Sequence, residues 1–286
     1  MILEEANLDY HLSPAISATK LKDFERSPAY YEAKHIFRDI SDEPSPAMVL
    51  GSAIHTALLE PAEFGFRYVE APKVDRRTKQ GKADWEAFQA TLEGRDALKP
   101  EDMETVRAVQ SSAQPVVEPF LGGATIEASV RVETEYGWLQ CRPDCWTAEG
   151  PVMDIKTIRD MASLQQQFFS FGYHIQDSFY RIVLEYESGK DPGPIQFVFV
   201  ETSPPYQVAR IQVDEETAVL TKHYVFSLLE KFWECSRTEE FPGRYNPFSI
   251  TEIAAPTWVR SKLEANAADK IAGFQALAVF ETEGGE

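Results

Sequence analysis

Two carboxylates and a lysine stand close together in the middle of the sequence, at Asp144, Asp154 and Lys156. Asp154 and Lys156 are two positions apart, so on a β-strand their side chains would point to the same face. A second strand, joined by a turn at residues 148–151, would bring Asp144 beside them. Such a group of charges suits a hard divalent cation and a phosphate, which points to metal-dependent phosphodiester cleavage.

The sequence around this group predicts the strands that must position it. Alternation of apolar and polar residues, or a short apolar run, marks five segments. The expected strands are residues 126–136, 138–146, 152–157, 194–201 and 208–213. One long amphipathic helix is expected between the third and fourth strands, at residues 161–186.

Most of the remaining sequence predicts helices. Ser17 and Ser27 are residues that commonly cap a helix start, and residues 48–59 form an apolar-rich helical run that carries His55. Further helices are expected at residues 100–120 and 215–235. This order of elements predicts an α/β fold (an α+β mixed sheet) in which a central mixed sheet is flanked by helices, behind a helical N-terminal region.

Length and composition fit one folded domain over residues 1–286. The apolar fraction of 43% and the aromatic fraction of 12% are ample for a hydrophobic core. Within this domain we expect a mainly helical part at residues 1–122, which carries His55, a core at 123–240 and a C-terminal segment at 241–286. No apolar run approaches the length of a membrane span, and three cysteines are an odd, sparse number for a secreted protein, so we expect a cytoplasmic protein.

A net charge of −18 argues against non-specific coating of nucleic acid, because backbone affinity comes from lysine and arginine. One basic stretch nevertheless stands out, with Lys73, Arg76, Arg77, Lys79 and Lys82. This stretch is either a local DNA-binding patch in an acidic protein or an ordinary solvated loop.

The whole pattern resembles the PD-(D/E)xK nuclease superfamily, which has the restriction-endonuclease-like fold. Within it, the chain looks like the nuclease domain of RecE-type exonucleases (exodeoxyribonuclease VIII). The resemblance covers residues 12–264 and rests on an ordered set of motifs rather than on one. The stretches that carry it are GSAIHTALLEP at 51–61, the basic segment around 76–82, CRPD at 141–144, MDIKT at 153–157 and YHIQDSFY at 173–180.

The resemblance implies a role for each residue of the site. His55, Asp144, Asp154 and the backbone carbonyl of Ile155 would hold Mg²⁺, for which Mn²⁺ would substitute. Lys156 would orient or deprotonate the attacking water and offset charge in the transition state. Taken alone, a histidine on an apolar helix is more often a satisfied core residue, and the resemblance is what favours a metal ligand. The sequence has no phosphate-binding loop of the Walker type, so we expect no requirement for ATP.

Three other residues have two interpretations each. Gln176 and Tyr180 are one helical turn apart and share a face, and the resemblance implies that they steady the lysine or a phosphate. Core packing explains Tyr180 almost as well. Glu127 is either an outer carboxylate for a second ion or a solvent-facing glutamate on a strand.

The resemblance also implies an activity and partners. The expected activity is 5′-to-3′ digestion of linear double-stranded DNA from its ends, which leaves 3′ single-stranded tails. A RecT-like single-strand annealing protein would load on these tails in recombination of the phage or prophage type. A ring-shaped homotetramer that threads DNA is implied as well.

Two alternatives remain open. One is a RecB- or Cas4-like nuclease of other polarity, although three cysteines without the required spacing argue against the iron–sulfur cluster of the Cas4 type. The other is a non-catalytic DNA-binding module on the same fold. Carboxylates that repel phosphate speak against such a module.

Overall fold

The computed structural model describes residues 1–3, 7–41, 44–147 and 150–267. The chain forms two compact units, Met1–Arg244 and Tyr245–Glu286. The expected turn at 148–151 lies partly outside the described residues. The expected helical C-terminal segment is helical at residues 257–267, and residues 268–286 lie outside the described residues.

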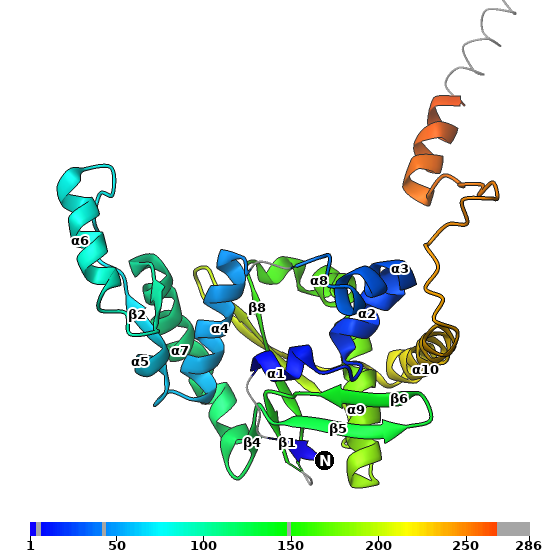
Figure 1. Cartoon of the computed structure of the whole chain (residues 1–286), viewed down its shortest axis with the longest axis horizontal. Coiled ribbons are helices and arrows are strands. Elements are labelled where there is room, and N and C mark those ends of the chain that lie inside the picture. Colours follow the sequence, from blue (N-terminus) through cyan, green and yellow to red (C-terminus); the bar gives the residue numbers. More distant parts are fainter. Residues whose placement is uncertain (4–6, 42–43, 148–149, 268–286) are drawn as a thin grey trace, which may run out of the picture. The chain divides into compact units, whose positions relative to one another are not determined.

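A mixed five-stranded sheet forms the centre of the first unit, in the strand order β10-β9-β8-β7-β4 (Figure 1). Its strands are β4 (Thr125–Ile126), β7 (Cys145–Trp146), β8 (Met153–Ile158), β9 (Gln196–Glu201) and β10 (Val208–Ile211). Strands β8 and β9 are parallel, and the other neighbours are antiparallel. The expected mixed sheet is therefore confirmed.

A second sheet was not expected. Strands β1 (Ile2–Leu3), β5 (Ser129–Thr134) and β6 (Gly137–Cys141) form an antiparallel sheet of their own. The predictions of continuous strands at residues 126–136 and 138–146 were therefore wrong, because each strand leaves one sheet and enters the other. Glu127, with φ of 46°, marks the first break, and residues 142–144 form the second.

Helices cover both faces of the five-stranded sheet. Helices α4 (Pro46–Leu59) and α7 (Pro100–Leu121) share a core with Ile155, Val198 and Val200 on one face. On the other face, α9 (Tyr173–Ser188) packs against Phe197 and Phe199. Helix α9 also contacts β5 and β6, so it lies between the two sheets, with α2 (Ala18–Arg26) and α10 (Glu215–Thr238) beside it. The other helices are α1 (Asn7–Leu12), α3 (Pro28–Tyr31), α5 (Phe64–Arg67), α6 (Lys79–Gln89) and α8 (Leu164–Ser170).

Local sequence signals account for several helix ends. The Ser17 hydroxyl accepts a hydrogen bond from the Lys20 N–H at the start of α2, and Ser27 does the same at the start of α3. Both caps satisfy an amide that has no partner inside the helix. Within the described part of the chain, no helix is both long and apolar enough to span a membrane.

The expected single helix at residues 161–186 is broken. A short 3₁₀ turn (Met161–Ser163) leads into α8, which ends at Ser170, and α9 begins at Tyr173. Gly172 between them has φ of 67°, in the region that favours glycine. A Cβ atom at this position would lie 2.8 Å from Cδ of Lys22, whose flexible side chain would have to shift.

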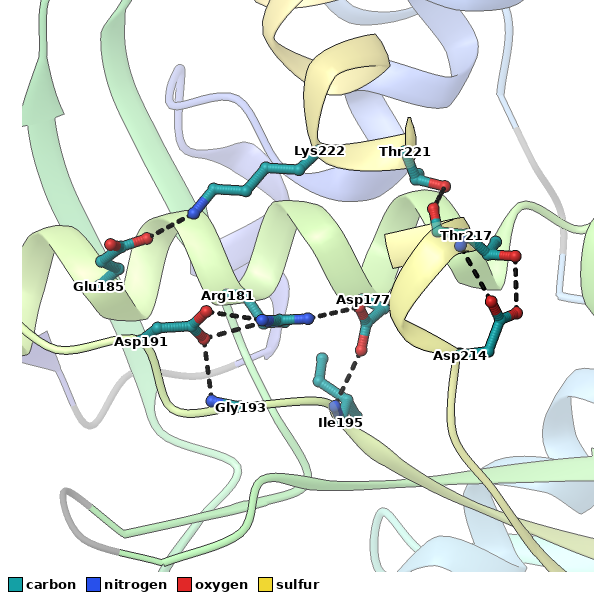
Figure 2. Close-up of polar contacts among 10 residues, drawn as sticks. All are labelled: Asp177, Arg181, Glu185, Asp191, Gly193, Ile195, Asp214, Thr217, Thr221 and Lys222. Carbon is teal, nitrogen blue, oxygen red and sulfur yellow. Dashed lines mark hydrogen bonds and ion pairs between the residues drawn. The ribbon is translucent and has the colours of Figure 1, made fainter. Parts of the chain in front are cut away.

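Polar contacts fix α9 against the segment that leads into β9 (Figure 2). The buried carboxylate of Asp177 accepts a hydrogen bond from the Ile195 N–H at 2.8 Å. Arg181, one turn later, donates to both oxygens of Asp191, at 3.0 and 2.6 Å, and Asp191 in turn accepts from the Gly193 N–H. These contacts set the position of the helix that carries Gln176 and Tyr180.

The basic stretch lies in an insertion between two short strands. Strands β2 (Tyr68–Glu70) and β3 (Asp96–Leu98) pair in parallel, and residues 71–95 between them, which we call the arm, contain α6. Thr78 caps α6 by accepting from the Gly81 N–H. In Figure 1 the arm extends away from the five-stranded sheet.

Candidate active site

An open cavity of ≈ 840 Å³ lies where β8, α4 and α9 meet. It brings together most of the residues that the sequence singled out. From these elements and the breaks between the sheets, the polar groups that face it include His55, Glu127, Arg142, Asp144, Asp154, Lys156, Gln176 and Tyr180. The two carboxylates that any metal site would need therefore lie on one cavity.

Asp154 and Lys156 occupy the same face of β8, as their spacing predicts. Asp154 is 2% exposed, and its Oδ1 forms an ion pair with the Lys156 ammonium. Its other oxygen accepts a hydrogen bond of 2.8 Å from the side-chain amide of Gln176 on α9. Gln176 thus steadies the aspartate in this structure rather than the lysine.

Asp144 lies directly before β7 rather than within a strand. Its Oδ2 accepts a hydrogen bond of 2.5 Å from the Ile155 N–H, which ties the loop to the centre of β8. Nδ1 of His55 on α4 lies 3.4 Å from the same oxygen. The Ile155 side chain is buried in the core on the opposite face, and the role of its carbonyl stays a prediction.

Glu127 faces the cavity and does not lie on a solvent-facing strand, which was one of the two positions that the sequence allowed. Its N–H donates to the Asp144 carbonyl at 3.1 Å, and its carboxylate lies 3.4 Å from the Arg142 guanidinium. Sequence periodicity could not find this position, because Glu127 sits at the break between two sheets. Arg142 was not singled out either, although a cation two residues before Asp144 is a usable signal.

Tyr180 fixes the loop that carries Asp144. Its hydroxyl donates to the Arg142 carbonyl at 3.3 Å, while its ring belongs to the hydrophobic core. Core packing and a polar contact at the site are therefore both present. Tyr180 and Gln176 share one face of α9, as their spacing predicts.

Burial and mutual charge shape the ionisation of the pair on β8. Burial raises the pKa of the Asp154 carboxyl to about 6, although the ammonium of Lys156 opposes this. Burial by itself would lower the pKa of Lys156, but the carboxylates of Asp154 and Asp144 outweigh burial and raise it. The lysine is accordingly a firmly charged ammonium in this arrangement.

The pKa values of Asp144, His55 and Glu127 are set by a different balance of burial and charge. Burial would raise the pKa of Asp144, but His55, Lys156 and the Ile155 N–H stabilise its anion and lower the pKa. The same carboxylate outweighs burial at His55 and raises the pKa of the imidazole. Burial and the charge of Asp144 raise the pKa of Glu127. The carboxylates of Asp144, Glu127 and Asp154 lie close together, so a bound cation would stabilise their negative charges.

The donor atoms fit a divalent metal ion. One atom each from His55, Glu127 and Asp144 lie within 4.8 Å of one another, and Asp154 faces the same cavity. Carboxylate oxygens with one imidazole nitrogen suit Mg²⁺ and Mn²⁺ better than a thiolate-binding metal. This set overlaps the expected ligands at His55 and Asp144, and it adds Glu127.

The basic residues of the arm do not line this cavity. Arg76, Arg77, Lys79 and Lys82 are exposed on and before α6. The Arg76 guanidinium lies over the Trp85 ring, 4.6 Å from its centre, and Arg77 pairs with Asp75. The strands that flank the arm do reach the site, because Tyr68 of β2 and Asp96 of β3 line the cavity.

Comparisons with known proteins agree with this geometry. Residues 17–247 match the family model described as "PDDEXK-like domain of unknown function (DUF3799)". No curated protein matches the sequence. The crystal structure of a protein from Eubacterium rectale, named "Putative exonuclease", is similar over 89% of this chain and 97% of its own, with 13% identity and a TM-score of 0.61. At that identity the likeness concerns the fold.

A second structure, SSO0001, is 14% identical over 81% of this chain and 92% of its own, and its TM-score of 0.28 carries no argument. The family match spans most of the chain and includes His55, Glu127, Asp144, Asp154 and Lys156, which all face the cavity. The chain therefore belongs to the PDDEXK-like domain family, with the PD-(D/E)xK nuclease fold.

Proposed function

We propose that this protein is a metal-dependent, ATP-independent exonuclease of the RecE type that acts on double-stranded DNA. One observation carries the proposal: Asp144, Asp154, Lys156, Glu127 and His55 converge on one open cavity of a nuclease fold. A cavity that only bound DNA would gain nothing from buried carboxylates, because they repel phosphate.

The residues divide the work between them. His55, Asp144, Asp154 and the Ile155 carbonyl would hold Mg²⁺, which when bound polarises the phosphate and lowers the pKa of a bound water. Lys156 orients the attacking water through its ammonium and offsets the negative charge of the transition state.

Neighbouring residues keep these groups in place. Gln176 holds the Asp154 carboxylate, and Tyr180 holds the backbone next to Asp144. Glu127, close to His55 and Asp144, supplies a further carboxylate at the same ion or at a second one.

The arm gives the substrate a place to bind outside the cavity. The residues that contact the phosphates of duplex DNA are Arg76, Arg77, Lys79 and Lys82. They form a local basic patch on a protein whose net charge is −18. Their contacts carry no sequence preference, which suits an enzyme that digests any linear end.

We further propose 5′-to-3′ digestion that leaves 3′ single-stranded tails for a RecT-like annealing protein, as in phage-type recombination. A ring-shaped homotetramer around the DNA would make repeated cleavage compatible with the acidic surface, because a closed ring need not hold DNA by charge alone. Sedimentation of the purified protein tests the ring, and a monomer at working concentrations would contradict it.

The decisive experiment uses linear duplex DNA labelled at either the 5′ or the 3′ end, with and without a 5′-phosphate. We expect nucleotides to be released in Mg²⁺ or Mn²⁺ and not in EDTA, without ATP, and the 5′ label to be released first. A closed circular duplex is the control, because an exonuclease cannot begin on it. If neither metal supports release from any linear substrate, the proposal is wrong.

The same experiment separates the alternative nuclease. Early loss of the 3′ label would indicate a RecB- or Cas4-like enzyme of the other polarity, and a brown chromophore in the purified protein would indicate an iron–sulfur cluster. The cysteines give no positive support to a cluster: Cys141 and Cys145 pack in different cores, and Cys235 lies on α10.

A further inference from the structure

A second cavity, of ≈ 620 Å³, lies beside the candidate active site. Helix α2 forms one wall, and the corner between α8 and α9 forms the other. Thr19 lines both cavities, so they adjoin. None of the roles proposed above uses this second cavity, which we call the strand pocket and define by Thr19, Lys22, Arg26, Phe169, Phe171 and His174.

The cations of the strand pocket are available to an anion. The Lys22 ammonium donates to the Phe171 carbonyl at 3.0 Å, and the Arg26 guanidinium lies over the Tyr30 ring. Across the described ranges, neither cation forms an ion pair with a carboxylate. Burial, followed by the nearby Lys156 ammonium, lowers the pKa of Lys22 to about 8, so an anion here would stabilise its charge.

The acids of the strand pocket are already engaged. Asp23 pairs with Lys34 at 3.1 Å and with His35 at 2.8 Å. The Glu25 carboxylate accepts a hydrogen bond of 2.7 Å from the Tyr224 hydroxyl. A hydroxyl donor does not neutralise a carboxylate, so Glu25 keeps its negative charge. The two cations Lys22 and Arg26 outweigh it and leave a net positive charge on this wall, which is the sign that a phosphate requires.

Two aromatic rings at the α8–α9 corner stand in solvent. Phe169 is 47% exposed and Phe171 is 55% exposed, although α8 and α9 bury other aromatic residues well. The Phe169 ring packs near the His174 ring, at 5.2 Å between centres. Within the described part of the chain, Nδ1 of His174 is buried and has no hydrogen-bond partner. An exposed aromatic face beside cations is the combination that binds unpaired nucleic-acid bases.

The strand pocket is also connected to the reaction centre. The ammonium groups of Lys22 and Lys156 lie 5.9 and 5.3 Å from the centre of the same Tyr173 ring. Lys22 and Lys156 thus both lie beside the Tyr173 ring, so neighbouring nucleotides of one strand could reach both. Gly172 at the corner allows the close contact between α9 and Lys22.

We infer that the strand pocket binds a nucleotide of single-stranded DNA next to the linkage being cut, with the base against Phe169 and Phe171 and the phosphate against Lys22 and Arg26. The inference rests on the proposed function, because the bound strand is the DNA strand that the enzyme digests. A paired base cannot do this, because its faces are already stacked in the duplex. The pocket therefore favours a strand that has separated from its complement before it is cut.

Binding of a short strand without cleavage tests the inference directly. A fluorescein-labelled thymidine hexanucleotide is titrated with the full chain in EDTA, and its anisotropy gives Kd. Phe169→Ala and Phe171→Ala should each weaken binding by about fivefold or more, as expected for loss of one stacked base. Tyr186→Ala, at the far end of α9 with a similar exposure of 44%, should leave Kd unchanged.

The phosphate contact has its own readout. Lys22→Gln should make the slope of log K against log salt shallower by about 0.7, the value for one phosphate contact to a single strand. Lys22→Arg should restore the slope, and Lys190→Gln, an exposed lysine beyond α9, should not change it. The phenylalanine variants should keep the wild-type slope, because they remove no charge.

Competition experiments distinguish binding of a nucleotide from binding of phosphate alone. Thymidine monophosphate should displace the labelled hexanucleotide only at concentrations far above the Kd of the hexanucleotide. Inorganic phosphate should require a still higher concentration than the mononucleotide. If phosphate alone competes as well as the mononucleotide, or if the phenylalanine variants bind like wild type, the inference is wrong. These binding results do not depend on cleavage, so an inactive wild type would contradict the proposed function and leave the inference to be decided by Kd alone.

Discussion

The Asp177 carboxylate gives a prediction whose magnitude follows from the structure. Its side chain is 0% exposed, and burial raises its pKa from 3.8 to about 6, despite the Ile195 N–H and the Arg181 guanidinium. A raised pKa means that the folded protein favours the protonated acid. The contribution of this group to stability is thus fully present below about pH 3.8 and is lost as the pH rises through about 6.

Asp177→Asn replaces the acid with a neutral amide that still accepts from the Ile195 N–H. The free energy of unfolding of the variant, minus that of the wild type, should rise by about 1.4 kcal/mol between pH 5 and pH 8. Equilibrium unfolding in urea at a series of pH values measures this difference. The change with pH matters here, because any constant effect of losing the charge beside Arg181 cancels.

Asp191→Asn is the matched control (Figure 2). Hydrogen bonds from Arg181 lower the pKa of Asp191, so its contribution is lost only as the pH falls through that low value. This variant should be less stable than wild type by a similar amount at pH 5 and at pH 8. A difference for Asp177→Asn that stays flat over this range would refute the raised pKa of Asp177.

Three further changes test the site and the arm. Lys156→Ala should slow metal-dependent nucleotide release, measured as acid-soluble product, by about 10²-fold or more. The variant should still bind linear duplex DNA in EDTA, as measured by gel shift. Undiminished release would show that Lys156 takes no part in the reaction. Asp144→Asn keeps an oxygen for the Ile155 N–H but loses the negative charge that would bind the ion. Thermal melts of the wild type should show that Mg²⁺ at a hundredfold excess over Kd stabilises it by about 2.7 kcal/mol, and this stabilisation should vanish in the variant. Equal stabilisation of both proteins would contradict the role of Asp144 as a ligand. Lys79→Ala combined with Lys82→Ala should make the salt dependence of duplex binding shallower by about 0.9 per lost phosphate contact without changing kcat, and an unchanged slope would exclude the arm from DNA contact.

The parts of the site that depend on local spacing could be predicted from the sequence. Asp154 and Lys156 share a face because side chains alternate on any strand, whatever the fold around it. Gln176 and Tyr180 share a face because they are one helical turn apart. Helix starts at Ser17 and Ser27 follow from local hydrogen bonds of their hydroxyls.

The parts that depend on distant contacts could not be predicted in this way. Residues 126–146 have the pattern of one long hairpin, but β1 and the segment at Ile16 pair with its outer half and draw it into a second sheet. That division is what turns Glu127 toward Asp144. The break at Gly172, where φ is 67°, was likewise not predicted, because the apolar period of 3.6 residues does not mark it.

The arm has a consequence for how members of this family can differ. The chain leaves the body at Glu70 and returns at Asp96, on neighbouring parallel strands, and these two points are roughly 8 Å apart. Because a parallel pair needs a crossover connection of about a dozen residues, the insertion could be shortened, lengthened or exchanged as long as a crossover of that length remains. In the proposed function, attraction for the substrate lies in this insertion and the chemistry of cleavage lies in the cavity, so natural relatives or protein engineers could vary one without the other.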